Sequence, residues 1–425
     1  MYKIKNRKPE EMKDSGVDLL GVVPRKWRLS YLKYILKYQK GKNPKEFTLN
    51  NGSNIPYVSA DYLRTGQTDN YVEITRGLIK TMEGDLLLLW DGANAGEFFE
   101  AKNGILGSTF ARLESITNDD YDYLKYYAKS YSAYLKAMTV GMGIPHVNTD
   151  ILKNLIIYKP IDYKEQKKIA NFLDIKTAQF DSIISKKEKL IEKLEEAKKS
   201  LISEVVTGKV KIVDGQMVKR KPEEMKDSGV EWLGVIPKEW EVKKLKYIAF
   251  LKSGETITNE AIEQEGPYPV YGGNGLRGYT NKFTHKGKHI LIGRQGALCG
   301  NINYAENKFW ASEHAVVVNI FTNTNIIWLG ELLRSMELNQ YSISAAQPGL
   351  SVWRISNLHI PYPPKNIQDE ISIFLESKLK EVEDLIMSIN IQIQKLKEAK
   401  QSLISEAVTG KIDLRDWEIT EEGGA

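Results

Sequence analysis

The chain of 425 residues contains two copies of one arrangement, and this repeat limits the possible fold more than any other feature. The string RKPEEMKDSGV begins at Arg7 and again at Arg220, an offset of 213. A second pair of strings, EAKKSLISEVVTGKV and EAKQSLISEAVTGKI, ends at Val210 and Ile412, an offset of 202. Repeat arrays have short periods and several copies, so two copies about 200 residues apart indicate duplication of a whole domain and its helix.

Each half carries a long segment with the heptad pattern of a coiled coil. Alternating steps of four and three residues give ten predicted core positions in each half, of which eight are apolar: Ile169, Leu173, Lys176, Phe180, Ile183, Lys187, Leu190, Leu194, Ala197 and Leu201, and then Ile371, Leu375, Lys378, Val382, Leu385, Ile389, Gln392, Leu396, Ala399 and Leu403. We predict two helices of about 40 residues, roughly 60 Å long, that pair antiparallel as a spacer. Gly208 and Gly410 are predicted to end them. Lys176 and Lys378 either fix the register or extend to solvent at a splayed helix end.

The two middles, about Pro24–Pro160 and Pro237–Pro364, contain short β-branched or leucine runs bounded by turn residues. We expect helices in them near Tyr121–Ala137 and Ile326–Leu338. The predicted fold class is α+β: two mixed α/β domains, rich in short twisted strands, separated by two long helices that form an antiparallel coiled coil. The predicted divisions are residues 1–160 for the first domain, 161–212 for the first long helix, 213–364 for a linker and the second domain, and 365–425 for the second long helix and C-terminal tail.

The middles align with each other in steps. An offset of 213 aligns Arg64 with Arg277, and an offset of 204 places DGANAG at 91–96 on QGALCG at 295–300. Glycine, proline and apolar positions are shared, whereas other residues are exchanged: Trp90 for Arg294, Asp91 for Gln295, Asn94 for Leu298, Thr109 for Glu313 and Phe110 for His314. A shared frame with exchanged polar residues is expected of two readers of different targets. Neutral drift on two exposed surfaces would produce the same pattern.

Composition narrows the classes of function. The net charge of +5 permits nucleic acid as a partner without requiring it. The single cysteine, Cys299, allows no internal disulfide, which fits a reducing cytoplasm. The chain has no long apolar run and begins with polar residues, so we expect no membrane span, no secretory signal and a cytoplasmic location.

Motifs that carry chemistry are missing from the sequence. Neither a P-loop nor a GxGxxG motif that opens a helix occurs, and no Asn/Asp-Pro-Pro-aromatic tetrapeptide of an amino-methylating DNA enzyme is present. No aspartate lies between Asp227 and Asp369, and His285, His289 and His314 are too few for a zinc or two-metal cluster. We therefore expect a binding protein without catalytic, metal or cofactor sites. A self-contained DNA methyltransferase or nuclease and a coiled-coil scaffold that binds proteins are the alternatives.

Several of these strings, taken in order and duplicated, carry a family resemblance. They are KDSGVDLLGVVPRKW and KDSGVEWLGVIPKEW, SLISEVVTGK and SLISEAVTGK, and the helices that begin EQKKIANFLD and IQDEISIFLE. The chain resembles the DNA-specificity subunit of type I restriction-modification enzymes. The resemblance implies a non-catalytic subunit with two target-recognition domains, each of which reads one half of a split site in double-stranded DNA. It also implies two modification subunits that methylate adenine and motor-nuclease restriction subunits, with S-adenosylmethionine, ATP and Mg²⁺ bound by those partners.

Candidate DNA contacts lie in the loops of the middles. Arg64 and Arg277 are equivalent, so they either grip phosphate or support the frame. Arg294 is a candidate for guanine, and Gln295 or Asn94 for adenine. The aromatic candidates for stacking beside a displaced base, or for the core, are Tyr271, Tyr279, Trp90 and Trp310. The other candidates are Asp91, Thr109, Asn274, Lys282, Glu313 and His314, of which Lys282, with Lys286 and Lys288 nearby, either contacts phosphate or is solvated. Because the middles differ, we predict a target with unlike halves.

Overall fold

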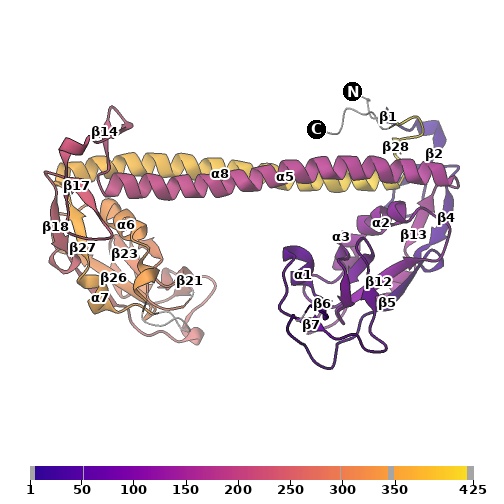
Figure 1. Cartoon of the computed structure of the whole chain (residues 1–425), viewed down its shortest axis with the longest axis horizontal. Coiled ribbons are helices and arrows are strands. Elements are labelled where there is room, and N and C mark those ends of the chain that lie inside the picture. The colour runs from indigo at the N-terminus through magenta and orange to yellow at the C-terminus, as the bar shows by residue number, and fades with distance from the viewer. Residues whose placement is uncertain (1–4, 51, 297, 343–348, 419–425) are drawn as a thin grey trace. The chain divides into compact units, whose positions relative to one another are not determined.

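The computed structural model describes residues 5–50, 52–296, 298–342 and 349–418. They form two compact units: unit 1 is Met1–Lys186 with Ile391–Ala425, and unit 2 is Lys187–Asn390. Each unit contains half of the long helix α5 (Tyr163–Val206) and half of the long helix α8 (Lys365–Val408). Both helices have 44 residues, close to the predicted length, and Figure 1 shows them in magenta and yellow.

Unit 1 contains two four-stranded sheets, in the orders β10-β9-β12-β5 and β7-β6-β11-β8, and three two-stranded pairs, β1-β28, β2-β3 and β4-β13. Its strands are β1 (Lys5–Asn6), β2 (Met12–Asp14), β3 (Val22–Pro24), β4 (Arg28–Tyr31), β5 (Leu36–Lys40), β6 (Ile55–Val58), β7 (Tyr71–Val72), β8 (Lys80–Thr81), β9 (Leu86–Leu89), β10 (Phe98–Glu100), β11 (Gly104–Leu106), β12 (Phe110–Ser115), β13 (Ile156–Lys159) and β28 (Ile412–Asp413). Its short helices are α1 (Ala60–Thr65), α2 (Tyr121–Ser130), α3 (Ser132–Ala137) and α4 (Thr149–Lys153), with 3-10 turns η1 (Pro9–Glu11) and η2 (Leu32–Tyr34).

Unit 2 repeats this plan with sheets β24-β23-β26-β19 and β21-β20-β25-β22 and pairs β14-β15, β16-β17 and β18-β27. Its strands are β14 (Val210–Val213), β15 (Gln216–Lys219), β16 (Met225–Asp227), β17 (Val235–Pro237), β18 (Glu241–Lys244), β19 (Ala249–Ser253), β20 (Tyr268–Gly272), β21 (Gly275–Thr280), β22 (His285–Lys286), β23 (His289–Gly293), β24 (Ile302–Ala305), β25 (Lys308–Ala311), β26 (Ala315–Ile320) and β27 (His359–Tyr362). Its short helices are α6 (Ile326–Ser335) and α7 (Val352–Ser356), with 3-10 turns η3 (Pro222–Glu224), η4 (Leu245–Tyr247), η5 (Asn259–Ala261) and η6 (Leu338–Tyr341). The duplication predicted from sequence is therefore confirmed strand by strand.

Hydrogen bonds correct one step of the predicted alignment. The Trp90 amide donates to the Thr109 carbonyl oxygen (2.7 Å), and the Arg294 amide donates to the His314 carbonyl oxygen (2.8 Å). Thr109 is thus equivalent to His314 and Phe110 to Ala315, so the predicted pairings of Thr109 with Glu313 and of Phe110 with His314 are both wrong by one residue. Unit 2 has one additional residue between the turn after β23 and strand β25. In β25 and β26, equivalent residues of the two units therefore differ in number by 205 instead of 204.

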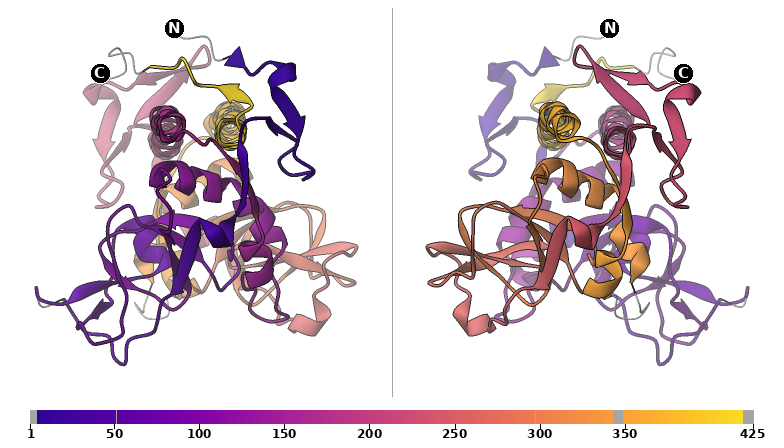
Figure 2. Two further views of the ribbon diagram at one scale, coloured as in Figure 1. Left: turned by 90° about the vertical axis from the view of Figure 1, so that its right-hand side faces the viewer. Right: turned by 90° about the vertical axis from the view of Figure 1, so that its left-hand side faces the viewer.

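One strand pair of unit 1 joins residues from near the two ends of the described chain. Strand β1 pairs with β28 in unit 1, with Asn6 opposite Ile412, and Figure 2 shows the two strands side by side. The hairpin β14-β15 has the same register in unit 2, with Lys219 opposite Val210. These are the same positions at the offsets of 213 and 202. Residues near the two ends of the described chain therefore form, in unit 1, the pair that a continuous hairpin forms in unit 2.

The long helices pair antiparallel within each unit. Lys400 Nζ lies 2.7 Å from Asp181 Oδ2 in unit 1, and Lys198 Nζ lies 2.9 Å from Glu383 Oε1 in unit 2. The two ion pairs are separated by the same number of residues along α5 as along α8, so both have one register. The predicted antiparallel pairing is confirmed.

In each long helix the predicted seam is correct at six of its ten positions and wrong at the other four. Ile183 and Leu190, predicted at the core, are 44% and 45% exposed, whereas Ile184 is 7% exposed. After Leu173 the steps run four then three, which places Thr177 in the seam, and its hydroxyl donates to the Leu173 carbonyl oxygen (2.7 Å). The same shift in α8 exposes Leu385 and buries Ile393. Lys176 and Lys378 therefore lie beside the seam, where their ammonium groups bond Gln179 and Glu381.

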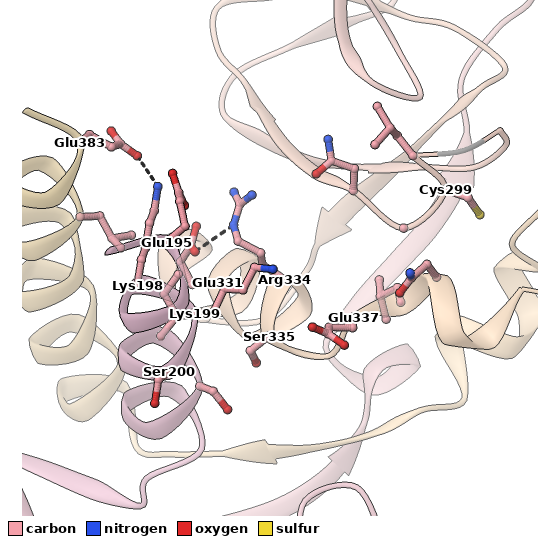
Figure 3. A pocket seen from close by; sticks show the side chains of 18 residues that line it. Glu195, Lys198, Lys199, Ser200, Cys299, Glu331, Arg334, Ser335, Glu337 and Glu383 are labelled. Atoms are coloured by element: carbon pink, nitrogen blue, oxygen red, sulfur yellow. Dashed lines mark hydrogen bonds and ion pairs between the residues drawn. The ribbon is translucent and has the colours of Figure 1, made fainter. Parts of the chain in front are cut away.

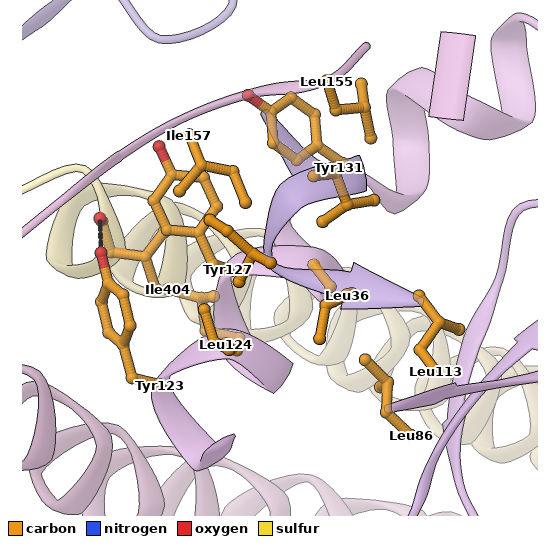
Figure 4. Packing of buried hydrophobic residues seen from close by; sticks show 14 of the residues in the cluster. Leu36, Leu86, Leu113, Tyr123, Leu124, Tyr127, Tyr131, Leu155, Ile157 and Ile404 are labelled. Atoms are coloured by element: carbon orange, nitrogen blue, oxygen red, sulfur yellow. Dashed lines mark hydrogen bonds between the residues drawn. The ribbon is translucent and has the colours of Figure 1, made fainter. Parts of the chain in front are cut away.

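The larger core of unit 1 lies between the sheet β10-β9-β12-β5 and the long helices. Helix α2 supplies Tyr123 and Tyr127, which pack with strand residues such as Leu36 and with Ile404 of α8 (Figure 4). The Tyr123 hydroxyl donates to the Val408 carbonyl oxygen (3.1 Å), so a buried polar group is satisfied at this junction. Helix α6 fills the equivalent place in unit 2, where its apolar residues pack with both long helices.

A buried glutamine joins each long helix to the start of the short helix beneath it. Gln166 Oε1 accepts from the Asp120 amide (2.8 Å), and its Nε2 donates to the Pro160 carbonyl oxygen (3.0 Å). Gln368, the equivalent residue, accepts from the Asn325 amide (2.8 Å) and donates to the Pro363 carbonyl oxygen (2.9 Å). Gln166 and Gln368 are 2% and 0% exposed. The repeat thus retains a polar link that fixes helix and domain together within each unit.

Replacing Gln368 with leucine is expected to destabilise unit 2 by about 2–6 kcal/mol, because the Asn325 amide and the Pro363 carbonyl oxygen lose their partner at roughly 1–3 kcal/mol each. Denaturant unfolding of the whole chain measures the change. Gln394→Leu is the matched control, since Gln394 is exposed on the same helix and bonds only a neighbouring glutamate, Glu398. Equal stability of the two variants would show that the buried link contributes nothing.

Candidate nucleic-acid interface

In unit 1, polar side chains gather where β9 ends and β12 begins. Strand β9 is four buried leucines, and the chain leaves the sheet directly after it at Trp90 and Asp91. The amides of both residues donate to the Thr109 carbonyl oxygen, at 2.7 and 3.3 Å. Lys40, the last residue of β5, places its ammonium group 2.9 Å from Asp91 Oδ2. Lys40, Asp91 and Thr109 therefore share one edge of the sheet.

Trp90 lies in the core, so its predicted role beside a displaced base is corrected. The side chain is 6% exposed, and its ring centroid lies 4.9 Å from that of Tyr38. Packing against Tyr38 beneath the sheet edge accounts for the burial of the indole. Lys40 Nζ, 5.6 Å from the indole ring, lies over it while it pairs with Asp91.

Two further candidates of unit 1 have partners within the domain. Arg64 donates from Nη2 to Glu97 Oε2 (2.8 Å), and its guanidinium lies 5.4 Å from the Phe99 ring. Asn94 Oδ1 accepts from Lys136 Nζ (2.9 Å). These contacts are consistent with support of the frame, and DNA contact by Arg64 or Asn94 remains a prediction.

The equivalent sheet edge of unit 2 holds different groups. The chain leaves β23 at Arg294 and Gln295, and Glu313 and His314 precede β26. Gln295 Oε1 lies 3.0 Å from His314 Nδ1, and His314 Nε2 lies 3.2 Å from Glu313 Oε1. The structure thus brings together Gln295, Glu313 and His314, which the sequence proposed separately, and places Arg294 beside them.

The remaining candidates of unit 2 lie around the second sheet. Tyr271 packs against Phe309 with ring centroids 5.8 Å apart, and burial raises the pKa of its hydroxyl. Trp310 Nε1 donates to the Glu255 carbonyl oxygen (3.1 Å). Asn274 accepts from the Asn301 amide group, and Arg277 donates from Nη2 to Asn259 Oδ1 (3.1 Å). Tyr279 is half-buried and Lys282 is exposed, so their DNA contacts stay predictions.

This part of unit 2 is uniformly basic. Residues 266–304 contain no aspartate or glutamate and five basic residues: Arg277, Lys282, Lys286, Lys288 and Arg294. Lys288 pairs with Glu306 (3.1 Å), which lies just outside the stretch. Clustered lysine and arginine attract the phosphate backbone independently of base sequence. The stretch therefore suits contact with nucleic acid next to the sheet edge of Arg294 and Gln295.

Packing accounts for His285 and His289 of unit 2. The rings of His285 and His289 lie 5.7 Å apart, and His285 stacks on Phe309. Burial and the neighbouring His289 lower the pKa of His285, which favours its neutral form. Among the residues that the structure describes, no group of three or more histidine, cysteine, aspartate or glutamate side chains is arranged to hold a metal ion.

A cavity of about 810 Å³ lies in unit 2 among α5, α6, α8 and the loop after β23 (Figure 3). The buried carboxylate of Glu331 accepts from the Tyr304 hydroxyl (3.0 Å) and from Arg334 Nε (3.0 Å). Lys198 pairs with Glu383, and both residues line the cavity. None of the candidate DNA contacts lines this cavity. The cavity is therefore distinct from the sheet edge described above.

Sequence reasoning missed Lys40. Its signal was present, because Lys40 and Gly41 align at the offset of 213 with Ser253 and Gly254. The Gly41 and Gly254 amides donate to the carbonyl oxygens of Phe110 and Ala315 (2.8 and 2.9 Å), so the glycine is shared and the residue before it is exchanged. Lys40 is therefore an exchanged residue within the shared frame, which is the criterion that identified the other candidates.

The comparisons with known proteins identify the family. The model of the type I restriction modification DNA specificity domain matches residues 24–196 and 237–395, which include both sheet edges. The chain belongs to this family. The specificity subunit of the type I restriction enzyme MjaVIII from Methanocaldococcus jannaschii is 31% identical over 93% of this chain and 95% of its own length. The EcoprrI specificity subunit from Escherichia coli is 42% identical, over 32% of this chain and 34% of its own length.

The fold agrees with a solved member of a type I restriction-modification system. That structure, described under complex assembly and conformational transition of the system, covers 91% of this chain and 98% of its own, with a TM-score of 0.64 and 14% identity. At this identity the likeness shows a common fold alone. In the part of the chain that is described, no helix is long and apolar enough to cross a membrane.

Proposed function

We propose that this specificity subunit reads a split, asymmetric DNA target, with one recognition domain for each half-site. The observation that carries the proposal is the pair of equivalent sheet edges, which share backbone hydrogen bonds but hold Lys40, Asp91 and Thr109 in unit 1 and Gln295 and His314 in unit 2. Phosphates are alike in both half-sites, whereas base edges differ. A common frame with exchanged polar groups is what two readers of unlike sequences require.

The paired helices α5 and α8 suit the task of setting the gap between half-sites. Two half-sites are read together only at a fixed spacing along the duplex. A flexible linker cannot fix that distance, because its end-to-end length fluctuates. Each long helix has 44 residues. An α-helix rises by about 1.5 Å for every residue, so its length defines a spacing.

The proposal assigns the chemistry to partner subunits in the cytoplasm. Two modification subunits, which bind S-adenosylmethionine, would methylate adenine in the sites that this chain selects, and restriction subunits would use ATP and Mg²⁺. The named relatives are subunits of restriction enzymes, which supports the partnership. The chain itself contributes DNA selection without catalysis.

Mapping methylated adenines in host DNA tests the function. Cells that contain the modification subunits are compared with and without this chain. We expect methylation at one bipartite sequence, with two unlike halves and a constant gap, only when the chain is present. Methyl transfer to DNA by the purified chain alone would instead identify a self-contained enzyme. Methylation that does not depend on the chain would favour a protein-binding scaffold.

A further inference from the structure

The side chains of Glu313, His314 and Gln295 form a short hydrogen-bonded chain at the sheet edge of unit 2. A carboxylate has no hydrogen to donate, so the contact of 3.2 Å to Glu313 Oε1 requires a hydrogen on His314 Nε2. The amide oxygen of Gln295 also only accepts, so its contact of 3.0 Å requires a hydrogen on Nδ1. In the protonated form of His314 both ring nitrogens donate, Nε2 to Glu313 and Nδ1 to Gln295.

This arrangement fixes which end of the Gln295 amide is available to a ligand. Protonated His314 uses the amide oxygen, so the amide nitrogen, with two hydrogens to donate, remains on an exposed side chain. Arg294, the preceding residue, also carries only donors. A glutamine that recognises adenine uses both its oxygen and its nitrogen, whereas guanine presents two acceptors, N7 and O6, in the major groove. The donors at 294 and 295 thus match guanine.

The equivalent position in unit 1 has the opposite hydrogen-bonding character. Asp91 replaces Gln295 and accepts only, and Thr109 replaces His314. Lys40 pairs with Asp91 from the end of β5, where unit 2 has Ser253. Acidic side chains accept from the amino group of cytosine. One frame therefore presents an acceptor in the first domain and a donor in the second.

We propose that Gln295, oriented by His314 and Glu313, reads a guanine in the second half-site. The proposal rests on the function proposed above and adds the base and the residues that select it. His314 and Glu313 are positioning residues, because they act through the amide of Gln295. Arg294 supplies further donors to the same base or to the phosphate beside it.

The test maps methylated adenines for the complete enzyme with Gln295→Glu, His314→Ala and Asp91→Asn variants, with thermal unfolding as a check on folding. The wild type should show a fixed guanine in the second half-site. Gln295→Glu should lower methylation of guanine-containing sites by roughly ten- to a hundredfold and favour a base that carries an amino group. His314→Ala should let the amide rotate, so that adenine is accepted beside guanine.

Asp91→Asn is the matched control, since it lies at the equivalent position of the other domain. It should change the first half-site and leave the second intact, and no variant should change the gap. A second half-site without guanine, or one that Gln295→Glu leaves unchanged in a folded protein, would overturn this inference while the split target still stood. Loss of the split target from the wild type would instead refute the proposed function.

Discussion

Replacing Gly208 or Gly410 with alanine is expected to destabilise the protein by about 2–5 kcal/mol. Both residues end a long helix with φ of +73°, a conformation that costs other residues roughly 1–2 kcal/mol. A β-carbon at Gly208 would lie 2.6 Å from Pro237 Cγ and 2.8 Å from Trp240 Cη2. The proline ring cannot turn aside, so overpacking adds about 1–3 kcal/mol.

Denaturant unfolding of the full chain measures this effect, and the hairpin β14-β15 supplies the control. Gly215 has φ of +74°, and a β-carbon there would have no atom within 4 Å. Gly215→Ala therefore isolates the backbone cost of roughly 1–2 kcal/mol. If Gly208→Ala and Gly215→Ala had equal stability, the packing of the helix end against Pro237 and Trp240 would carry no energetic weight.

These two glycines show what could be predicted from sequence. Each follows a long heptad pattern in a duplicated string, so the C-terminal ends of both helices were predictable to within two residues. The heptad phase, which decides which residues of each helix form the seam, was not predictable. Ile183 is followed by Ile184, and Leu190 by Ile191, so counting apolar residues gives two nearly equal seams. Contacts with the antiparallel partner decide between them, and those contacts are not written in either helix alone.

The sheet edges show a similar division. The exchange of Asp91 for Gln295 was visible, because the two glycines that follow it, Gly92 and Gly96, align with Gly296 and Gly300. The equivalence of Thr109 with His314 was not visible, because one additional residue precedes β25 and only the sheet register locates it. The burial of Trp90 also depends on Tyr38 of a neighbouring strand. Sequence therefore located the region of the candidate site, and pairing between distant strands defined which side chains meet.

The second large effect is expected from lengthening both long helices by one heptad. Residues 184–190 of α5 are repeated once, and the antiparallel residues 391–397 of α8 are repeated once, which preserves the seam and the register of the two ion pairs. Seven residues add about 10 Å to a helix, and base pairs are spaced about 3.4 Å apart along DNA. We expect the methylated target to keep both half-sites and to gain a gap about three base pairs longer, with loss of methylation at the original target.

Mapping methylated adenines measures both the gap and the half-sites of the lengthened protein. Lengthening α5 alone is the control, because seven unmatched residues would place the apolar seam of one helix against the wrong turns of the other and destabilise the pair. A longer gap with unchanged half-sites requires that the helices determine spacing and the sheet edges determine sequence. An unchanged gap in a folded, active enzyme would mean that partner subunits set the spacing, and altered bases within a half-site would mean that the helices take part in reading them.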